Sequence, residues 1–483
     1  MPELTRGRKL VVLAICCMSL LIVSLDNTAL NVALPSMRRE FGASVAGMQW
    51  TVDAYALVLA SLLMLSGSTA DRIGRRRVFT VGLVVFVLGS LLCSLAPSLP
   101  ALVAFRMVQA VGGSMLNPVA MSIITNTFTD PAERARAIGL WGGVVGISMA
   151  MGPLVGGLLV ETISWRAIFW VNLPIGLAAL LLTLRFVPES RAPHPRRPDP
   201  VGQILVTALL ASLTYAIIES SLPVAVVSVL ALAGLLSYEP RRREPLIDLR
   251  FFHSAPFTGA TVIAVCAFSA LGGFLFLNTL YLQVVRGLSA LHAGLFMLPM
   301  AAMSLIFAPL SGRLVGARGP RPSLLLAGTA MTAGALMFAA FHAERSTPLL
   351  FTGYVVFGIG FGLVNAPITN TAVSGMPRSQ AGVAAAVAST SRQTGQTLGV
   401  AVAGAVLAAG LGAVRHAPGG WSLDAFLAAS EPAYWIITGW GLCVLVAGAV
   451  SSGAWARRTA RHTAELLRTA DEAHPTPANA PPR

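Results

Sequence analysis

The sequence is dominated by apolar runs that recur along its whole length, many of them about 18 residues or longer. A run of this length allows a helix to cross the hydrocarbon core of a bilayer. Only 11% of the 483 residues are charged, against about 25% in a soluble domain, so polar surface is too scarce for a water-soluble globule. The chain is therefore expected to be an all-α polytopic membrane protein.

The distribution of basic residues predicts the orientation of the chain. Most of the 34 Lys and Arg residues fall in alternate loops and in the two tails. By the positive-inside rule, these loops and both chain ends are cytoplasmic. The net charge of +14 suits contact with anionic membrane lipid and requires no nucleic-acid partner. We expect a multi-pass monomer in the cell (inner or plasma) membrane.

Fourteen membrane spans are predicted, in the order six, two and six. The predicted spans are residues 10–34, 47–69, 78–96, 101–125, 137–160, 167–186, 201–218, 223–238, 257–284, 291–313, 322–342, 349–371, 382–411 and 433–456. The predicted units are a cytoplasmic N-terminal tail (1–9), a six-helix bundle (10–186), basic linkers with two inserted spans (187–256), a second six-helix bundle (257–456) and a cytoplasmic, partly disordered tail (457–483).

An internal repeat supports this division, because the loop after the second predicted span resembles the loop after the tenth. At one constant offset, the positions that match are Gly67, Gly74 and Arg76 in the first loop, and Gly312, Gly319 and Arg321 in the second. The loops are equivalent only if the two middle spans are an insertion. Two six-helix halves with the same orientation suit a transporter whose substrate site lies between them.

Three ionisable residues inside the predicted spans of the N-terminal half stand out, namely Asp26, Asp53 and Arg106. Such groups are costly in a bilayer and are functional candidates. The helical rise of about 1.5 Å per residue places all three in the outer half of the membrane, where they can interact across neighbouring helices. A carboxylate balanced between an arginine and apolar surroundings can carry a proton, if each side of the membrane reaches it in turn. The alternative is a static ion pair that only fixes helix packing.

Other kinds of site are not indicated. No group of His, Cys and Asp has the spacing of metal ligands, and no phosphate-binding glycine loop is present. We expect no metal and no cofactor, with the proton as coupling ion, and a secondary active transporter rather than an enzyme.

The fifth predicted span is rich in small residues. Glycines permit close helix contact, and a proline within a helix removes a backbone hydrogen bond. A hinge or seal between the halves is the functional interpretation, and ordinary tight packing is the alternative. The residues concerned are Gly146, Gly152, Pro153, Gly156 and Gly157.

Four motifs together resemble the major facilitator superfamily, and within it the fourteen-helix drug/proton antiporters of the actinobacterial multidrug or antibiotic exporter type. The motifs are residues 25–35, 67–77, 106–118 and 146–157, and residues 164–176 are also typical of these exporters. The resemblance covers roughly residues 11–456. It implies the major facilitator fold, with two six-helix bundles and two inserted helices, but does not specify the substrate.

The resemblance also implies roles for particular residues. Asp26 and Arg106 resemble the family's coupling residues. The loop after the second span resembles an inner gate, in which a carboxylate can cap a helix N-terminus of the other half. The alternative is that its charges only set topology. The gate residues implied are Gly67, Asp71, Arg72, Gly74, Arg75 and Arg76. Two departures from the family's pattern are Ala110, where glycine is usual, and Gly316, where the second loop lacks the matching Asp.

A pocket for drugs needs apolar and aromatic walls with a few polar groups. The candidate residues are Asn31, Trp50, Tyr55, Gln109, Asn278, Tyr281, Asn365, Arg392 and Gln393. Arg392 is the one obvious embedded charge of the second half, which favours neutral or weakly charged substrates. The sequence thus predicts a proton-coupled antiporter that exports amphipathic small molecules by alternating access. Alternatives are an exporter of native lipid or secondary metabolite, or a membrane receptor or scaffold that does not transport and would not need these motifs.

Overall fold

The computed structural model describes residues 5–192, 199–242, 245–341, 346–374, 376, 381–412 and 423–473. Regular structure in these ranges is entirely helical, which confirms the expected all-α class. The N-terminal half comprises α1 (Arg6–Phe41), α2 (Val45–Ile73), α3 (Arg75–Ser94), α4 (Leu99–Thr127), α5 (Pro131–Thr162) and α6 (Ala167–Phe186). The inserted pair comprises α7 (Pro200–Ile218) and α8 (Leu222–Tyr238).

Short helical turns lead from the inserted pair into the C-terminal half. They are the 3₁₀ segments η1 (Glu239–Arg241) and η2 (Leu249–His253). The C-terminal half comprises α9 (Ala255–Leu280), its continuation η3 as a π-helix (Tyr281–Val285), α10 (Ala290–Arg318), α11 (Pro320–Phe341), α12 (Thr347–Val373), α13 (Ala381–Gly412) and α14 (Leu423–Ser451). A last helix, α15 (Ala454–Ala473), follows α14.

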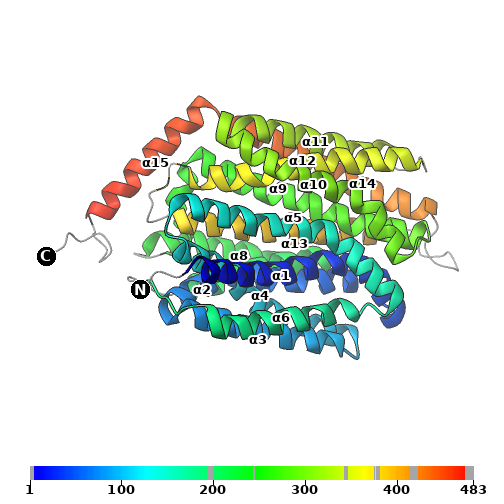
Figure 1. Ribbon diagram of the computed structural model, residues 1–483. Helices are drawn as coiled ribbons and strands as arrows, with labels where there is room; N and C mark the ends of the chain where they lie inside the picture. Colours follow the sequence, from blue (N-terminus) through cyan, green and yellow to red (C-terminus); the bar gives the residue numbers. More distant parts are fainter. Residues whose placement is uncertain are drawn as a thin grey trace.

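Membrane-crossing segments account for nearly all of the fold. Within the described residues, thirteen helices are long and apolar enough to cross a membrane, and α5 contributes a shorter apolar stretch, Met151–Thr162. The chain is therefore a multi-pass membrane protein, with about fourteen spans formed by α1–α14. In Figure 1, α1 begins and α14 ends at the same side of the bundle, which we call the terminal side, in contrast to the opposite side.

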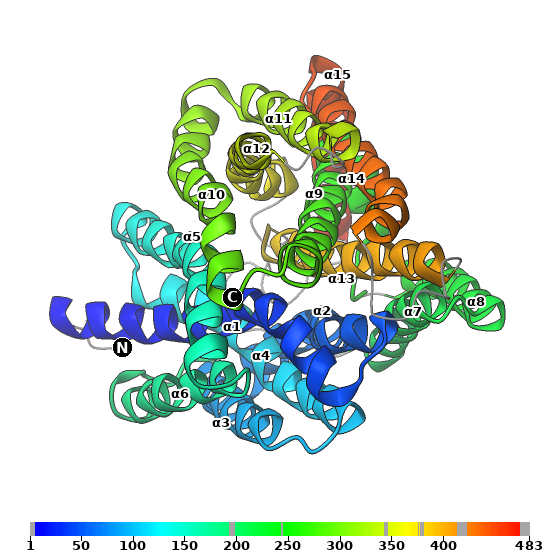
Figure 2. The same cartoon turned by 90° about the vertical axis from the view of Figure 1, so that its right-hand side faces the viewer.

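The two halves lie next to each other, and two helix pairs join them. Viewed along the helices, α5 lies beside α10 on one flank, and α2 lies beside α13 on the other (Figure 2). The inserted α7 packs against both α2 and α13, while α8 lies outside α7 (Figure 2). The seam between α2 and α13 is thus covered by α7.

The predicted repeat has a structural counterpart in two glycines. Gly74 ends α2 with φ of 129°, and Gly319 ends α10 with φ of 77°. L-residues with a side chain rarely adopt these positive φ values, so both turns require glycine. In each turn the glycine N–H donates to the carbonyl oxygen four residues earlier, from Gly74 to Ala70 at 3.0 Å and from Gly319 to Val315 at 2.9 Å.

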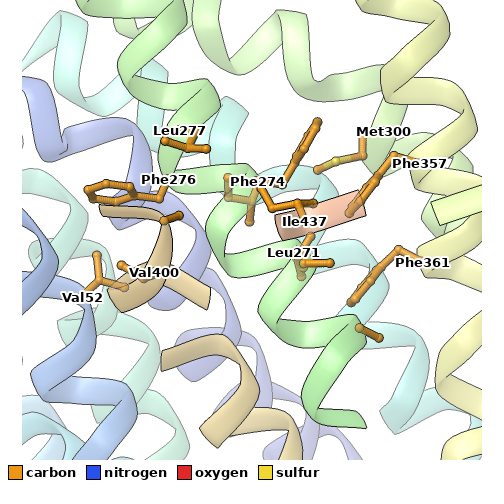
Figure 3. Packing of buried hydrophobic residues seen from close by; sticks show 14 of the residues in the cluster. Val52, Leu271, Phe274, Phe276, Leu277, Met300, Phe357, Phe361, Val400 and Ile437 are labelled. Atoms are coloured by element: carbon orange, nitrogen blue, oxygen red, sulfur yellow. The ribbon is translucent and has the colours of Figure 1, made fainter. Parts of the chain in front are cut away.

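Aromatic side chains fill the interior of the C-terminal half. The ring of Phe274 on α9 stacks on that of Phe357 on α12, with centroids 4.5 Å apart and ring planes 8° from parallel. Figure 3 shows this pair, with Val52 of α2 near Val400 of α13 in the contact between the halves. Side chains of α9 thus help to form the core of the C-terminal half, and α9 also contacts α1 of the other half.

The C-terminal segment differs most from expectation. The sequence predicts a span over 433–456 followed by a partly disordered tail, whereas α14 ends at Ser451 and α15 follows. Apolar or small residues recur along α15 with helical spacing, which a count of its charges does not reveal. The predicted disorder of residues 474–483 lies outside the described residues.

Candidate functional site

The carboxylate of Asp26 on α1 and the guanidinium of Arg106 on α4 form a buried ion pair. Arg106 Nη1 donates to Asp26 Oδ2, and neither side chain is exposed. The structure thus brings together two of the three charged residues predicted to meet within the membrane. Each charge has the other as its partner, which offsets part of the cost of burying a lone ion.

Three polar side chains complete this network. Asn172 Nδ2 donates to Asp26 Oδ1 at 2.8 Å, and Gln109 Nε2 donates to the same oxygen at 3.0 Å. Both amides also donate to Ser90 Oγ, at 3.0 Å from Asn172 and 2.7 Å from Gln109. Gln109 Oε1 in turn accepts from Arg106 Nη1 at 2.7 Å. Gln109 is therefore part of the ion-pair network rather than of a substrate cavity, and four helices supply the network.

Sequence reasoning missed Asn172 and Ser90. Each is an uncharged polar residue in a largely apolar span, so it lacks the charge that would mark it as costly. The available signal for Asn172 was its position in the exporter-like segment 164–176, together with the general avoidance of lipid by amide groups.

Arg106 also contacts the backbone and an aromatic ring of α2. Its Nε donates to Thr51 O at 3.4 Å, and its Cζ lies 4.1 Å from the centroid of the Tyr55 ring. This places the cation over the face of the ring, a favourable arrangement. The ring of Tyr55 thus packs against Arg106, and its hydroxyl is buried without a hydrogen-bond partner among the described residues.

Asp53 does not join this network. It lies two residues before Tyr55, which is about 200° around an α-helix, so it points to the other side of α2. Gln49, one turn away from Asp53, donates to the carbonyl oxygens of Val400 at 3.2 Å and Ala401 at 2.7 Å on α13. Asp53 therefore lies on the face of α2 that meets the C-terminal half.

The carboxylate of Asp53 is buried without compensation. The residue is fully buried, and neither carboxylate oxygen has a hydrogen-bond partner among the described residues. An ionised carboxylate in such surroundings is strongly disfavoured, whereas a protonated carboxyl is tolerated far better. Of the three charged residues predicted within the membrane, Asp53 is thus the one whose charge the structure leaves unbalanced.

Trp50 faces the inserted helices. Its Nε1 donates to Glu219 Oε1 at 2.9 Å, and its ring lies 5.8 Å from that of Tyr215 on α7. It therefore does not line a central cavity, because a side chain on this face of α2 is directed outward to α7. Gln203, near the start of α7, donates to Ser61 O of α2 at 2.5 Å.

Two glycines of α5 allow it to contact α1 closely. A Cβ at Gly152 would lie 2.6 Å from the Cβ of Thr28, and one at Gly156 would lie 2.9 Å from the Cβ of Ala29. Real Cβ atoms do not approach this closely, so these positions require glycine. In this region the small residues serve tight packing within the N-terminal half.

Two further close approaches connect α5 to the C-terminal half. A Cβ at Gly157 would lie 2.6 Å from Ala290 O on α10, and Gly294 of α10 packs directly against the backbone of Pro153. Pro153 lies within α5, which continues past it as one helix. The immediate surroundings of Gly146 lie outside the described side chains.

The described hydrogen bonds between the halves lie toward the opposite side. Besides the bonds from Gln49, Leu291 N donates to Glu161 Oε2 at 3.1 Å, and Gln283 Nε2 donates to Val32 O at 2.8 Å. Toward the terminal side, by contrast, a Cβ built on Gly142 of α5 or Gly312 of α10 would meet no atom within 4 Å. The halves are thus closed at the opposite side.

Gln283 separates two hollows between the halves. On its terminal side, a small pocket is lined by Asn31 and Val32 of α1 with residues of α5, α9 and α10. On its opposite side, a vestibule of about 920 Å³ is lined by the end of α1, including Arg38 and Arg39, and by Glu161. Asn31 is the cavity candidate that lines the pocket, and no feature of the sequence singled out Gln283.

The polar candidates of α9 lie inside the C-terminal half. Asn278 is fully buried, donates to Phe274 O at 2.9 Å and accepts from Tyr354 Oη at 2.9 Å. The ring of Tyr281 stacks on that of Phe426, with centroids 6.3 Å apart. Both residues therefore stabilise helix contacts and do not line the pocket.

The remaining candidates lie on α12 and α13. Arg392 Nη2 donates to Thr369 Oγ1 at 2.5 Å, which links the two helices. Asn365 and Gln393 are half-buried. The structure places these residues together toward the terminal side of the C-terminal half, and not in the pocket that contains Asn31.

The predicted gate loop is held within the N-terminal half. Arg75 Nη2 donates to Asp71 Oδ1 at 2.8 Å, and the Arg75 N–H donates to Ser190 O at 2.9 Å. The Ala192 N–H donates to Asp71 O at 3.0 Å. The described hydrogen bonds of the Asp71 carboxylate are both from Arg75 to Oδ1, and they do not include the cap on a helix of the other half that the resemblance implied.

Glu189, just after α6, binds the same loop. Its Oε1 accepts from the Arg76 N–H at 3.1 Å, and a Cβ on Gly74 would lie 2.6 Å from that oxygen. Gly67 is half-buried on α2, and Arg72 is exposed. The acidic partner that orders the loop was therefore absent from the predicted gate.

Known proteins similar to this chain are also membrane transporters. The family described as Major Facilitator Superfamily matches residues 16–400. The chain belongs to the Major Facilitator Superfamily. It is 38% identical over 405 residues to multidrug resistance protein Stp of Mycobacterium tuberculosis (strain CDC 1551 / Oshkosh), covering 82% of this chain and 75% of that protein.

Two further relatives, described below, also come from actinobacteria. The tetracenomycin C resistance and export protein of Streptomyces glaucescens is 35% identical, over 85% of this chain and 78% of that protein. The multidrug efflux pump LfrA of Mycolicibacterium smegmatis (strain ATCC 700084 / mc(2)155) is 35% identical, over 89% of this chain and 87% of that protein. The resemblance to actinobacterial multidrug and antibiotic exporters is thereby confirmed.

Solved structures confirm the major facilitator fold. A bacterial homologue of the human lysosomal transporter Spinster, in an inward-facing and unoccupied conformation, superposes with a TM-score of 0.65 at 20% identity, covering 95% of this chain and 99% of that chain. A D-xylose-proton symporter gives 0.66 at 14% identity, covering 90% of this chain and 96% of that chain.

Proposed function

We propose that this chain exports amphipathic small molecules, such as drugs or antibiotics, across the cell membrane in exchange for protons. The relatives named for multidrug resistance and efflux support the export of drugs. In this proposal the terminal side is cytoplasmic, the transporter works as a monomer, and the proton is the only coupling ion. The basic loops of the sequence support this orientation.

The observation that carries proton coupling is Asp53. It is a buried carboxyl without a hydrogen-bond partner, on the α2 face that meets α13. The halves must separate along this face when the opposite side opens, and the environment of Asp53 then changes. A carboxyl that is dry in one state and wet in the other binds a proton in the first and releases it in the second.

Asp26 and Arg106 have a different role in this mechanism. Arg106 is paired with Asp26 in this structure, and its contacts with Thr51 and Tyr55 connect the pair to the helix that carries Asp53. Asp26 exchanges a proton only in a state in which the pair opens. The network thus fixes the rotation of α2 that directs Asp53 to the C-terminal half.

The substrate route runs between the halves. Substrate enters from the terminal side, reaches the pocket beside Asn31, and leaves through the vestibule once the Gln283–Val32 hydrogen bond and the contact at Gly157 open. Opening one end requires closing the other, which is alternating access. The largely apolar lining of the pocket, with Asn31, Thr28 and Ser304 as polar members, suits a neutral or weakly charged amphipathic molecule.

Export of a native secondary metabolite is a second candidate. It is supported by the relative named for tetracenomycin C resistance and export. The candidates differ in substrate range and not in mechanism, so the test is susceptibility of expressing cells to a panel of unrelated amphipathic antibiotics. Drug export predicts resistance to several of them, abolished by a protonophore. Unchanged susceptibility to the whole panel would contradict drug export, and resistance unaffected by the protonophore would contradict proton coupling.

A further inference from the structure

The helix α15 begins two residues after the last membrane-crossing helix ends. α14 ends at Ser451 and α15 starts at Ala454, and α15 slants away from the bundle on the terminal side (Figure 1). A membrane-crossing helix ends where the hydrocarbon core meets the headgroups. The first turn of α15 therefore lies at the level of the lipid headgroups.

One face of α15 packs against the protein. Along this face the side chains of Ala456, Ala460, Thr463 and Leu467 are buried, with the spacing of successive helical turns. They contact α9 and η2. The segment that leads into the C-terminal half is attached to the same helix, because the Ala255 N–H donates to Thr459 Oγ1 at 3.0 Å.

The remaining surface of α15 has an apolar flank and a basic face. Trp455 is 61% exposed and Leu466 is 42% exposed. They are eleven residues apart, so they lie within about 20° of each other around the helix. Arg457, Arg458 and Arg461 are also exposed and lie about 60–160° from Trp455 around the helix, with the exposed Glu465 among them. The three arginines form no ion pair within the described residues.

We propose that the N-terminal turns of α15 lie at the membrane surface on the terminal side and bind anionic phospholipid headgroups. Trp455 occupies the interface, where tryptophan is enriched in membrane proteins. Arg457, Arg458 and Arg461 face the phosphates, since a basic amphipathic helix next to a span is attracted to an anionic leaflet. Through Thr459, the lipid-bound helix anchors the start of the C-terminal half.

The test places a probe on the apolar flank of the full-length protein. With the five native cysteines replaced by alanine, His462→Cys carries an environment-sensitive fluorophore on the line between Trp455 and Leu466. The protein is reconstituted in phosphatidylcholine vesicles with brominated phosphatidylglycerol or, at the same mole fraction, brominated phosphatidylcholine. We expect at least about twofold stronger quenching by the anionic lipid. A probe quenched by neither lipid, or equally by both, would overturn the proposal.

The arginines are tested by matched triple variants. Arg457→Gln/Arg458→Gln/Arg461→Gln is expected to abolish the preference for phosphatidylglycerol, and the corresponding triple Lys variant to keep it. The control Arg313→Gln/Arg318→Gln/Arg321→Gln removes the same charge elsewhere on the terminal side and is expected to keep the preference. Equal loss in the control would show a general effect of net charge and contradict a site on α15. Because quenching does not depend on transport, this result is independent of the export proposal.

Discussion

Asp26 and Arg106 form an ion pair within the membrane-crossing part of the protein, and neither side chain is exposed. The pair joins α1 to α4, and the amides of Asn172 and Gln109 bind its carboxylate from α6 and α4. Removing one charge of such a pair leaves the other buried and unpaired. The same pair thus contributes to stability and, through the contacts of Arg106 with Thr51 and Tyr55, to the position of the helix that carries Asp53.

Asp26→Asn is expected to lower the free energy of unfolding by about 3–5 kcal/mol, because Arg106 then lacks its counter-charge. Asn172→Ala, which removes one hydrogen bond, is expected to lower it by only about 1–3 kcal/mol. Unfolding of the purified protein, followed by denaturant or heat, measures both. Equal stability of Asp26→Asn and wild type would contradict a buried ion pair.

The double variant Asp26→Asn/Arg106→Gln separates a structural from a functional role of the pair. It removes both charges, so we expect most of the lost stability to return. We also expect that export driven by a pH gradient does not return with it. Restored export would show that the pair only fixes helix packing.

Gly157→Ala is expected to reduce export strongly, because the added Cβ would lie 2.6 Å from Ala290 O and prevent closure at the opposite side. The matched control is Gly142→Ala in the same helix, where a Cβ meets no atom within 4 Å. Export of a fluorescent dye from cells, normalised to the amount of protein in the membrane, compares the two. Similar activities would argue against closure through this contact.

Gln283→Ala removes the hydrogen bond to Val32 O between the pocket and the vestibule. A net loss of about 1 kcal/mol raises the population open to the opposite side about fivefold. The readout is labelling of Asn31→Cys by a membrane-impermeant maleimide added at the opposite side. Gln393→Ala serves as control and is expected to label at the unchanged rate. No acceleration in Gln283→Ala would exclude this hydrogen bond as part of the closure.

The inserted pair is expected to move with the N-terminal half. Hydrogen bonds from Gln203 and to Glu219 attach both ends of α7 to α2, while α7 meets α13 across a small hollow lined by side chains that include Leu210, Leu213 and Leu398. We therefore expect α7 to stay attached to α2 when α13 shifts relative to α2.

Cross-linking tests this assignment in a variant without native cysteines. Joining Ala60→Cys to Leu210→Cys fixes α7 to α2, and we expect export to continue. Joining Leu213→Cys to Leu398→Cys fixes α7 to α13, and we expect export to stop. As the matched control, each cross-link is made as a disulfide and then reduced, and export is measured before and after reduction. Equal effects of the two cross-links would show that α7 does not belong to the N-terminal half.

The sequence predicted which charges lie in the membrane but not all of their directions. Depth follows from helical rise, so Asp26 and Arg106 could be placed at the same level, and the structure pairs them. The rotation of α2 depends on its neighbours, which is why the sequence did not reveal that Asp53 faces α13 and that Trp50 contacts α7 in this structure. Uncharged polar residues such as Asn172 and Gln283 escaped notice because hydropathy gives them little weight.

The overall fold was more accessible than the site. Apolar runs, alternate basic loops and the loop repeat predict the helices and the two equivalent halves, and Gly74 and Gly319 end corresponding helices with positive φ. The helix α15 was missed because its buried face consists mainly of small residues, including Ala456 and Ala460, which contribute little to hydropathy.

The central claim is that Asp53 carries the exchanged proton. The most direct measurement is proton release on addition of substrate to the purified protein in proteoliposomes, followed with a pH-sensitive dye, for wild type and Asp53→Asn. Asp248→Asn, which removes a carboxylate outside the α2–α13 interface, is the control. We predict release from wild type and the control, and none from Asp53→Asn although substrate still binds. Undiminished release from Asp53→Asn would contradict the claim.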